Sequence, residues 1–275
     1  MFRVHQGELD MKHDKHERLV KLSRDITIES KRTIFLLQRY TGPESNPSVL
    51  EQALSKIQDI QKQKFHQVAM ELKGEEPYQF LRAYSPGLQE YIEALSFYHY
   101  IKSKRLVSLD EVQKDLIFTE ERTDVSDDSG VKSDISGENQ NTNSGPDTQV
   151  VSNSDRGVIE VFVPPSEYML GLADLTGELM RLAINSVGVG NLDTPFEVCS
   201  FLREMRSAFS SLQYVSREMN RKVSVLNQSL QKVETACYTL QVRGSEIPKH
   251  MLADVFSSGP SHGPMFEEDN VTQDD

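Results

Sequence analysis

The stretch SPGLQEYIEALSFYHYI (Ser85–Ile101) predicts a largely buried helix, because apolar and aromatic residues cover most of its surface. It also contains Glu90 and Glu93. At a spacing of three residues on a helix, the two side chains lie on one face, one turn apart. Burying two ionised carboxylates is costly unless a cation or hydrogen-bond donors compensate the charge. The stretch therefore predicts an acidic pair that needs a partner.

A second stretch, YMLGLADLTGELMRLAI (Tyr168–Ile184), repeats this pattern with Asp174 and Glu178 four residues apart among leucines. Two helices of this kind can face one another and bring four carboxylates together. Oxygen donors suit a hard divalent ion, so the pattern predicts a Mg²⁺ site, with Mn²⁺ as the second choice. Such a site favours phosphoryl chemistry.

Two other interpretations of the acidic pairs stay open. The carboxylates can be structural, each ion-paired within the bundle, for example to Arg181 or Arg82. Helix bundles also hold di-iron centres, but these use Glu-x-x-His motifs, and no histidine follows Glu90 or Glu178 at that offset. The sequence also lacks a G-x-x-x-x-G-K-[ST] phosphate loop and a complete H-E-x-x-H zinc motif.

The net charge of −12 is unevenly distributed along the chain. Residues 120–155 carry nine acidic and two basic side chains, and residues 266–275 carry five acidic side chains and no basic one. The rest of the chain therefore has no net charge, and its basic residues can form a local patch. The overall acidity does not exclude a nucleic-acid-binding protein.

Apolar residues recur at helical intervals through most of the chain, and 37% hydrophobic residues can supply a real core. We therefore predict an all-α fold, one antiparallel bundle of six or seven helices without a sheet. Residues 8–118 and 158–256 are expected to form its two halves. Residues 119–157 predict a disordered acidic linker and residues 257–275 a disordered acidic tail. The expected helices span residues 13–40, 48–74, 77–103, 108–118, 164–186, 194–211 and 219–243.

Three local features carry further predictions. Pro86 with Gly87 is expected to interrupt the third helix and to bend it just before the glutamates. Gly171 and Gly177 are expected at positions where helices pack closely, because glycine within a helix otherwise costs stability. Apolar residues over 219–240 alternate steps of four and three, which predicts a seam that packs on a helix of this chain or of a partner.

No apolar run in the sequence is long enough for a signal-peptide core or a membrane span. Cys199 and Cys237 lie in apolar helical patterns, where we expect reduced core residues. These features predict a soluble intracellular protein that does not act at a membrane.

The helix predicted for residues 13–40 has a basic polar face. Between residues 12 and 39, eight basic side chains outnumber four acidic ones. This face is either a solvated surface with ion pairs or a stripe that contacts phosphates. The candidate nucleic-acid contacts are Arg18, Lys21, Arg24, Lys31, Arg32 and Arg82.

Five segments of the sequence resemble the translin family. They are long and specific, and the resemblance covers most of the chain from about residue 9 to residue 256 except the linker. The segments are HERLVKLSRDITIESKRTIFLLQR (16–39), GLQEYIEALSF (87–97), ADLTGELMR (173–181), NSVGVGNLDTPFEV (185–198) and VRGSEIPKHMLADVF (242–256).

The resemblance implies a seven-helix bundle that assembles with translin into a closed hetero-oligomer. It implies that the subunit with the paired glutamates is the catalytic subunit of a Mg²⁺-dependent endoribonuclease. The expected substrates are single-stranded RNAs. The resemblance implies roles in RNA interference, where the nicked passenger strand is removed, and in the trimming of tRNA fragments. Single-stranded DNA is a further expected ligand. Glu90, Glu93 and Asp174 match the family's catalytic residues, and Glu178 matches a further acidic position.

The alternative function is a non-catalytic subunit that binds translin and modulates the binding of single-stranded RNA or DNA. Family members also begin with a basic extension suited to nuclear import, whereas this sequence starts close to the first helix, and its linker is longer and more acidic. We expect a protein of cytoplasm and nucleus, with nuclear import not supported by this sequence.

Overall fold

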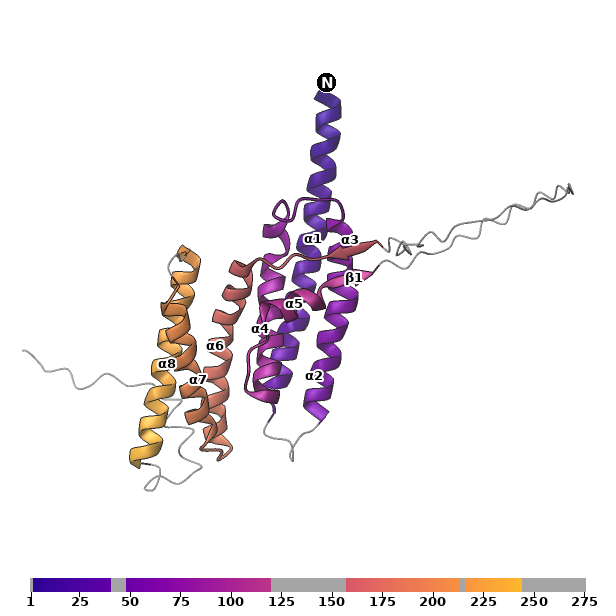
Figure 1. The fold of residues 1–275 in the computed structure, drawn as a ribbon. Helices are drawn as coiled ribbons and strands as arrows, with labels where there is room; N and C mark the ends of the chain where they lie inside the picture. Colours follow the sequence, from indigo (N-terminus) through magenta and orange to yellow (C-terminus); the bar gives the residue numbers. More distant parts are fainter. Residues whose placement is uncertain (1, 41–47, 120–156, 213–215, 244–275) are drawn as a thin grey trace, which may run out of the picture.

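The computed structural model describes residues 2–40, 48–119, 157–212 and 216–243. These residues form seven helical rods and one short ribbon of two strands (Figure 1), which confirms the all-α prediction. The second rod is continuous through two α-helical parts and a π-helical part. The predicted acidic linker and tail lie almost entirely outside the described residues. The helices are α1 (Phe2–Leu37), α2 (Ser48–Asp59), η1 (Ile60–Phe65), α3 (His66–Leu72), α4 (Leu81–Ser103), α5 (Leu109–Asp115), α6 (Pro165–Gly188), α7 (Thr194–Ser210) and α8 (Arg217–Arg243).

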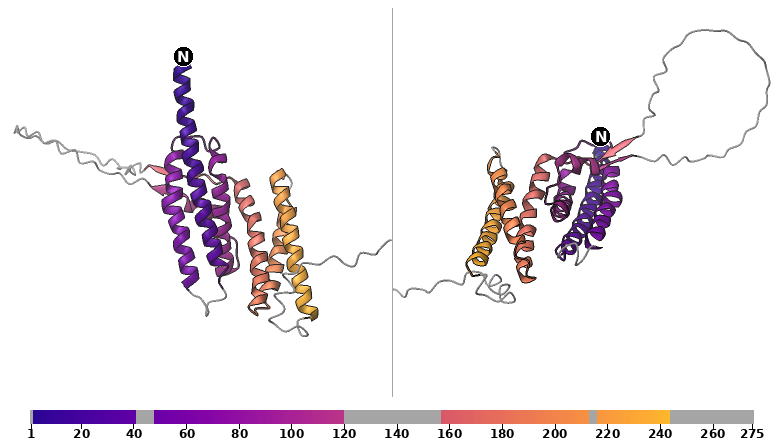
Figure 2. Two further views of the ribbon diagram at one scale, coloured as in Figure 1. Left: turned by 180° about the vertical axis from the view of Figure 1, so that it is seen from behind. Right: turned by 60° about the horizontal axis from the view of Figure 1, so that its bottom comes forward.

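Helix α4 lies at the centre of the bundle. It packs against α1 and α2 in one half and against α6 in the other, and α7 and α8 pack on α6 (Figures 1 and 2). Every residue from 91 to 98 is buried, including Glu93. The apolar seam over 219–240 packs within this chain, on α6 and α7. The helix that carries the first acidic pair is thus enclosed by the rest of the fold.

Helices α4 and α6 are parallel neighbours, although consecutive long rods within each half run antiparallel (Figure 1). Between α4 and α6 the chain passes through α5 and the ribbon and returns to the end of the bundle where α4 begins. Two contacts show the register. Gln89 Nε2 donates to Glu167 Oε2 at 2.6 Å, and Gly171 lies against Gln89 and Ile92.

Two glycines permit close helix contacts at this centre. A Cβ atom on Gly87 of α4 would lie 2.7 Å from the carbonyl oxygen of Ser23 on α1. A Cβ atom on Gly171 of α6 would lie 2.8 Å from the carbonyl oxygen of Gln89 on α4. Gly177 has no such neighbour within 4 Å, so its predicted packing role is wrong, whereas that of Gly171 is confirmed.

The ribbon consists of β1 (Ile117–Thr119) and β2 (Val158–Glu160), which pair antiparallel. The prediction of a bundle without a sheet is therefore wrong in this one detail, because strands of three residues are too short to show alternation. The side chain of Gln113 continues the pairing. Its Nε2 donates to the carbonyl of Val161 at 3.2 Å, and its Oε1 accepts from the amide of Val163 at 2.9 Å.

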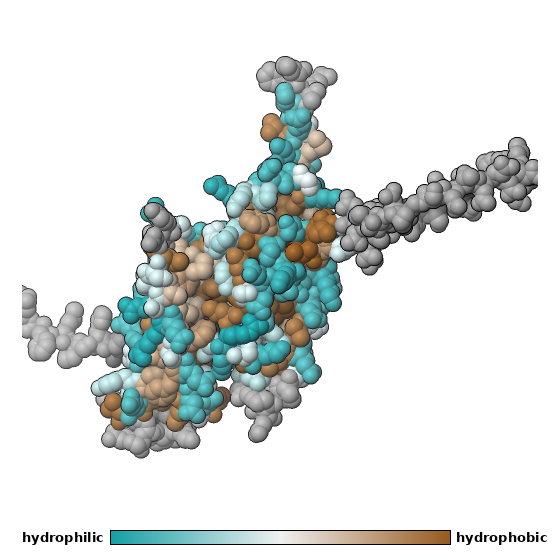
Figure 3. Space-filling model, viewed as in Figure 1, coloured by the Kyte–Doolittle hydropathy of each residue, from teal (hydrophilic) through white to brown (hydrophobic). Residues whose placement is uncertain are grey.

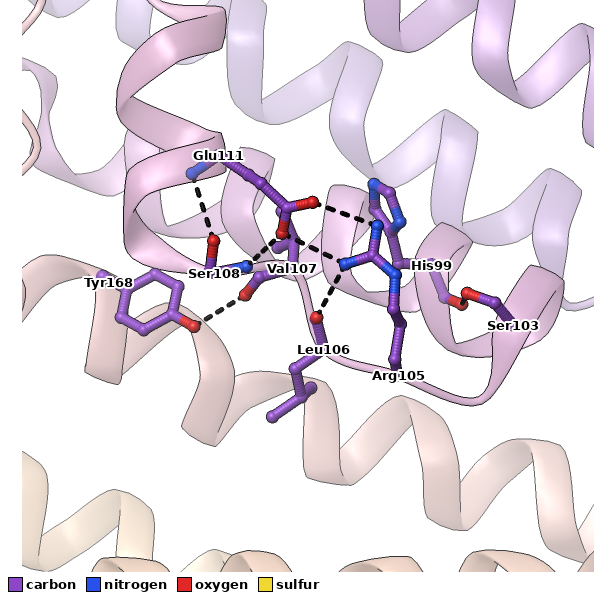
Figure 4. A network of polar contacts seen from close by, with 8 residues as sticks. All are labelled: His99, Ser103, Arg105, Leu106, Val107, Ser108, Glu111 and Tyr168. Carbon is purple, nitrogen blue, oxygen red and sulfur yellow. Dashed lines mark hydrogen bonds and ion pairs between the residues drawn. The ribbon is translucent and has the colours of Figure 1, made fainter.

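A polar network fixes the start of α5 between α4 and α6 (Figure 4). Ser108 and Glu111 form a capping box, in which each side chain accepts a hydrogen bond from the other residue's amide. Arg105 donates to both carboxylate oxygens of Glu111 at 3.1 Å. The hydroxyl of Tyr168 on α6 donates to the carbonyl of Val107 at 2.7 Å. The crossover, which is the connection from α4 to α6 through α5 and the ribbon, is thus tied to α6.

Helix α1 begins at Phe2, well before the predicted start at residue 13. Residues 5–14 are all exposed and extend beyond the bundle (Figures 1 and 3). They show no apolar face because they cover no core, so periodicity gave no signal for them. The extension contains no proline to end the helix.

Helix α4 is continuous through Pro86, so the predicted interruption is wrong. Pro86 lies in the second turn of the helix, and its missing amide removes only one backbone hydrogen bond, to the carbonyl of Arg82. Pro86 is exposed, and its ring therefore displaces no core residue.

The surface seen in Figure 3 intersperses hydrophilic and hydrophobic residues. Among the described residues, no helix is both long and apolar enough to cross a membrane.

Cys199 and Cys237 are buried free thiols, as predicted.

Candidate active site

The four predicted carboxylates lie together at the contact between α4 and α6. Glu90 and Glu93 come from α4, and Asp174 and Glu178 come from α6. Gly171 of α6 packs on Gln89 and Ile92 of α4, and Asp174 follows Gly171 by about one turn as Glu93 follows Glu90, so the parallel helices bring the two pairs to neighbouring levels. We call these four residues the carboxylate cluster.

Glu93 is the most deeply buried member of the carboxylate cluster, with 8% of the residue exposed. Burial, followed by repulsion from the other three carboxylates, raises the pKa of Glu93 to about 9, while Lys222 opposes the shift. Burial also raises the pKa of Glu90, against the attraction of Lys31. The cluster therefore retains a proton at neutral pH, which shows that its negative charges are only partly compensated.

Side chains from α1 and α6 approach two of the carboxylates. Lys31 Nζ lies 3.4 Å from Glu90 Oε2, and an Arg181 guanidinium nitrogen lies 3.5 Å from Glu178 Oε1. Gln38 Nε2 donates to Glu178 Oε2 at 2.8 Å and to the backbone carbonyl of the same residue at 3.0 Å. Glu178 is thereby held both from the turn that follows α1 and from its own helix.

Lys222 brings a third cation to the cluster from α8. It forms an ion pair with Asp174, and its Nζ donates to Gln89 Oε1 at 3.0 Å. Lys222 lies 48 positions from Asp174 in the sequence, so no local spacing could have revealed this contact. The sequence indicates only that Lys222 lies beside the apolar seam of α8, next to Val223, and so close to the core.

The donor set fits a divalent cation. All four side chains offer oxygen, which Mg²⁺ and Mn²⁺ prefer, and a cation would relieve the repulsion that raises the pKa of Glu93. Within the described residues, no three His, Cys, Asp or Glu side chains already converge in a geometry that could hold a metal ion. Three of the carboxylates are turned toward Lys31, Lys222 and Arg181 instead. Ion binding therefore requires an exchange of these ion pairs.

A cleft of about 510 Å³ opens beside the cluster between α1, α4 and α6. Three carboxylates and three cations line it, together with an exposed aromatic ring, Phe35. A phosphodiester in this cleft would therefore meet positive side chains close to the carboxylates. The charged lining residues are Glu90, Glu93, Glu178, Lys31, Arg32 and Arg181.

The exposed positions between residues 21 and 39 form a single stripe along α1. Five of these seven side chains are basic and none is acidic, because Asp25 and Glu29 are half-buried and paired with Lys64 and Arg32. We call this set the basic stripe. Its members are Lys21, Arg24, Ile28, Lys31, Arg32, Phe35 and Arg39.

The structure separates the six candidate nucleic-acid contacts. Lys31 and Arg32 line the cleft, and Lys21 and Arg24 continue the basic stripe away from it. Arg18 instead donates two hydrogen bonds, of 2.8 Å and 3.0 Å, to the carboxylate of Glu71 on α3. Arg82 is exposed on α4 and belongs neither to the stripe nor to the cleft lining.

The sequence and fold resemble known proteins. A model of the translin family matches residues 14–244. The chain is 52% identical over 257 residues to the translin-associated protein X of Pongo abelii, which covers 93% of this chain and 82% of that protein. It is also 32% identical over 78 residues to the translin of Gallus gallus, covering 28% of this chain and 34% of that protein.

Two solved structures share the fold at low sequence identity. A crystal structure of apo-NeC3PO superposes with a TM-score of 0.59 at 18% identity and covers 85% of this chain and 94% of that one. A structure of an AfC3PO–duplex RNA complex superposes with a TM-score of 0.55 at 15% identity and covers 90% and 99% of the two chains. At these identities the likeness establishes the fold.

Proposed function

The chain belongs to the translin family, and from this premise we propose that it is the catalytic subunit of a metal-dependent endoribonuclease formed with translin. Its substrate would be single-stranded RNA. The observation that carries the proposal is the carboxylate cluster, four acidic side chains from two parallel helices beside a cleft with a basic rim.

The residues of the cluster have distinct roles in this proposal. Glu90, Glu93, Asp174 and Glu178 would hold one or two Mg²⁺ ions, or Mn²⁺, with Gln38 keeping Glu178 in place. When bound, a divalent ion supplies charge stabilisation to the reacting phosphodiester. Loss of the proton from the buried cluster would accompany ion binding, since a carboxylate must be ionised to act as a ligand.

The cations of the cleft would position the substrate. Lys31, Arg32 and Arg181 line the cleft beside the carboxylates, where they can bind the phosphates that flank the bond to be cleaved. Lys21 and Arg24 continue this positive surface along α1. Contacts of this kind bind the backbone without reading its sequence.

The similar proteins support translin as the partner and RNA in general as the ligand. The relatives include proteins named translin-associated protein X and translin, and one solved structure of the same fold is described as a complex with duplex RNA. For this chain we propose roles in removing the nicked passenger strand during RNA interference and in trimming tRNA fragments.

The ion pairs of the cluster favour a second candidate function. Lys31, Lys222 and Arg181 each contact a carboxylate of the cluster, which is also the arrangement of a structural network. In that case the chain would be a non-catalytic subunit that binds translin and modulates the binding of single-stranded RNA or DNA.

Cleavage of a labelled single-stranded RNA by the chain co-expressed with translin tests the proposal. The assay compares Mg²⁺ with EDTA and compares the wild type with Glu90→Gln/Glu93→Gln. The matched control is Glu71→Gln/Glu75→Gln, which also removes two carboxylates that are paired with α1, to Arg18 and Lys15, outside the cleft.

We expect cleavage that needs Mg²⁺, that is lost in the cluster variant and that persists in the control variant, with assembly unchanged in both. A wild-type assembly without activity, or activity that survives in the cluster variant, would contradict the nuclease proposal and support the non-catalytic subunit.

A further inference from the structure

Phe35 is exposed beside the carboxylate cluster in a way that packing does not explain. With 70% of the residue accessible, it is the most exposed large hydrophobic residue among the described ones, and it lines the same cleft as Glu90, Glu93 and Glu178. A lone exposed apolar residue on a protein surface is ordinary. An exposed aromatic ring in a charged cleft is a candidate for contact with a ligand.

The neighbours of Phe35 on α1 are cations. Lys31 precedes it by four residues and Arg32 by three, so both side chains lie one helical turn away on the same face. Ile28, one further turn away, is 48% exposed on the same stripe. Along the basic stripe, pairs of cations are thus followed by single apolar residues, and Lys31, Arg32 and Phe35 are its members that line the cleft.

This combination matches the requirements of an unpaired nucleic-acid strand. Proteins that bind single strands without sequence preference use cations that follow the backbone and aromatic rings on which bases stack. Paired bases are stacked within their helix and are not free to lie on a side chain. A ring beside the reactive centre would therefore favour an unpaired nucleotide at the bond to be cleaved.

A protein partner is the less suitable occupant of this surface. The fully buried centre of a protein interface is poor in charged residues, Lys in particular. Arg and Phe are common in such centres, but Lys and Glu are depleted there, and the cleft around Phe35 presents Lys31 together with Glu90, Glu93 and Glu178.

We propose that Phe35 is the stacking platform for one nucleobase next to the cleaved phosphodiester, and that it gives the enzyme its preference for unpaired RNA. The inference rests on the proposed nuclease function for its position, because it assigns the base contact of the same cleft. Binding of RNA alone, without cleavage, is sufficient to test it.

The test is a double-mutant cycle between the protein and the RNA. The complex with translin carries Phe35→Leu, which keeps an apolar side chain but removes the ring, or the conservative Phe35→Tyr. The RNA is a short single strand of uniform sequence in which one nucleotide at a time is replaced by an abasic one. Dissociation constants are measured in EDTA, and cleavage rates are measured in Mg²⁺.

The matched control is Tyr238→Leu. Tyr238 is 68% exposed on α8 and does not line the cleft, so this variant removes an equally accessible ring from elsewhere on the same chain. A hairpin of the same length tests the preference for unpaired RNA.

We expect Phe35→Leu to weaken binding of the intact strand by about 5- to 150-fold, the range for one base stacked on an aromatic side chain. The loss should nearly vanish on the RNA that is abasic at one particular position, Phe35→Tyr should restore binding, and Tyr238→Leu should leave it unchanged. With active enzyme, the cleaved bond should adjoin that position.

Three outcomes would overturn the inference. Phe35→Leu could bind every RNA as the wild type does, it could lose the same factor on intact and abasic strands, or it could fail to assemble with translin, which would make Phe35 a protein contact. Failure of the nuclease proposal is separate, since an inactive wild type would leave the binding cycle in EDTA intact.

Discussion

The contact between α4 and α6 at Gly171 can be tested with two alanine substitutions on one helix. Gly171→Ala places a Cβ atom 2.8 Å from the carbonyl oxygen of Gln89 and 2.8 Å from Ile92 Cβ, whereas Gly177→Ala places it where nothing lies within 4 Å. Both substitutions gain the same intrinsic preference of alanine for a helix, about 1 kcal/mol. The difference between the two variants therefore isolates the packing contribution.

Overpacking of this kind costs about 1–3 kcal/mol, because a backbone oxygen cannot move aside as a flexible side chain can. We therefore expect Gly177→Ala to raise the free energy of unfolding by about 1 kcal/mol and Gly171→Ala to leave it unchanged or to lower it by up to about 2 kcal/mol. At about 2–4 °C per kcal/mol for a chain of this size, the melting temperatures of the two variants should differ by about 2–12 °C.

Thermal unfolding followed by far-UV circular dichroism measures this difference. The protein concentration is held fixed, since association shifts the melting temperature. Cleavage of RNA supplies a second readout, because separating α6 from α4 separates Asp174 from Glu90. Equal stabilisation by the two alanines would refute the close contact and, with it, the register that brings the two acidic pairs together.

Three other measurements test the charges around the cluster. Burial raises the pKa of Glu93 from 4.5 to about 9, so the folded protein binds more protons than the unfolded chain between these two pH values. Without divalent ions, the free energy of unfolding should therefore fall as pH rises through that window, by at most about 1.4 kcal/mol per pH unit. Urea titrations from pH 5 to 8.5 should show a flatter profile for Glu93→Gln than for the wild type. Lys222→Gln removes a positive charge from Asp174 and should lower the dissociation constant for Mg²⁺ by on the order of tenfold in calorimetry, whereas a weaker Mg²⁺ affinity would exclude competition between Lys222 and the ion. Lys31→Ala should weaken RNA binding and reduce the slope of log Kd against log salt concentration by about one unit. Arg18→Ala breaks an exposed ion pair with Glu71, so it should change the free energy of unfolding by at most about 1 kcal/mol and leave RNA binding unchanged.

The helices could be predicted from the sequence because each one has its own apolar periodicity. Proline at the start of α6 and of α7 and the Ser108–Glu111 pair at α5 mark their beginnings. The N-terminal extension of α1 was missed because it covers no core. The ribbon was missed because β1 and β2 are short and pair across a long separation. These errors share one cause, since neither feature leaves a local apolar pattern.

The acidic pairs of the site could be found from the sequence because each pair lies on one helix. Glu90 and Glu93 are separated by three residues among aromatic neighbours, so their burial was predictable from adjacent residues alone. Their partners were not predictable, because Lys31 and Lys222 come from helices distant in the sequence. Phe35 was not singled out either, since an aromatic residue in a helix usually faces the core, and only the fold places this one in the cleft.

The site depends on the crossover between α4 and α6 more than on any single helix. A short loop would have made these two helices antiparallel, and their acidic residues would then share a depth only at one particular loop length. The crossover makes them parallel, and their register is held by contacts that lie outside the cluster, from Tyr168 to Val107 and from Gln113 to Val163. All four of these residues belong to α5, the segments around it or the start of α6, so the relative height of the carboxylates is set before the chain enters the body of α6. The fold can therefore keep the repelling carboxylates together, because neutral hydrogen bonds and close packing at Gly171 hold the two helices in register in addition to the ion pairs with Lys31, Arg181 and Lys222.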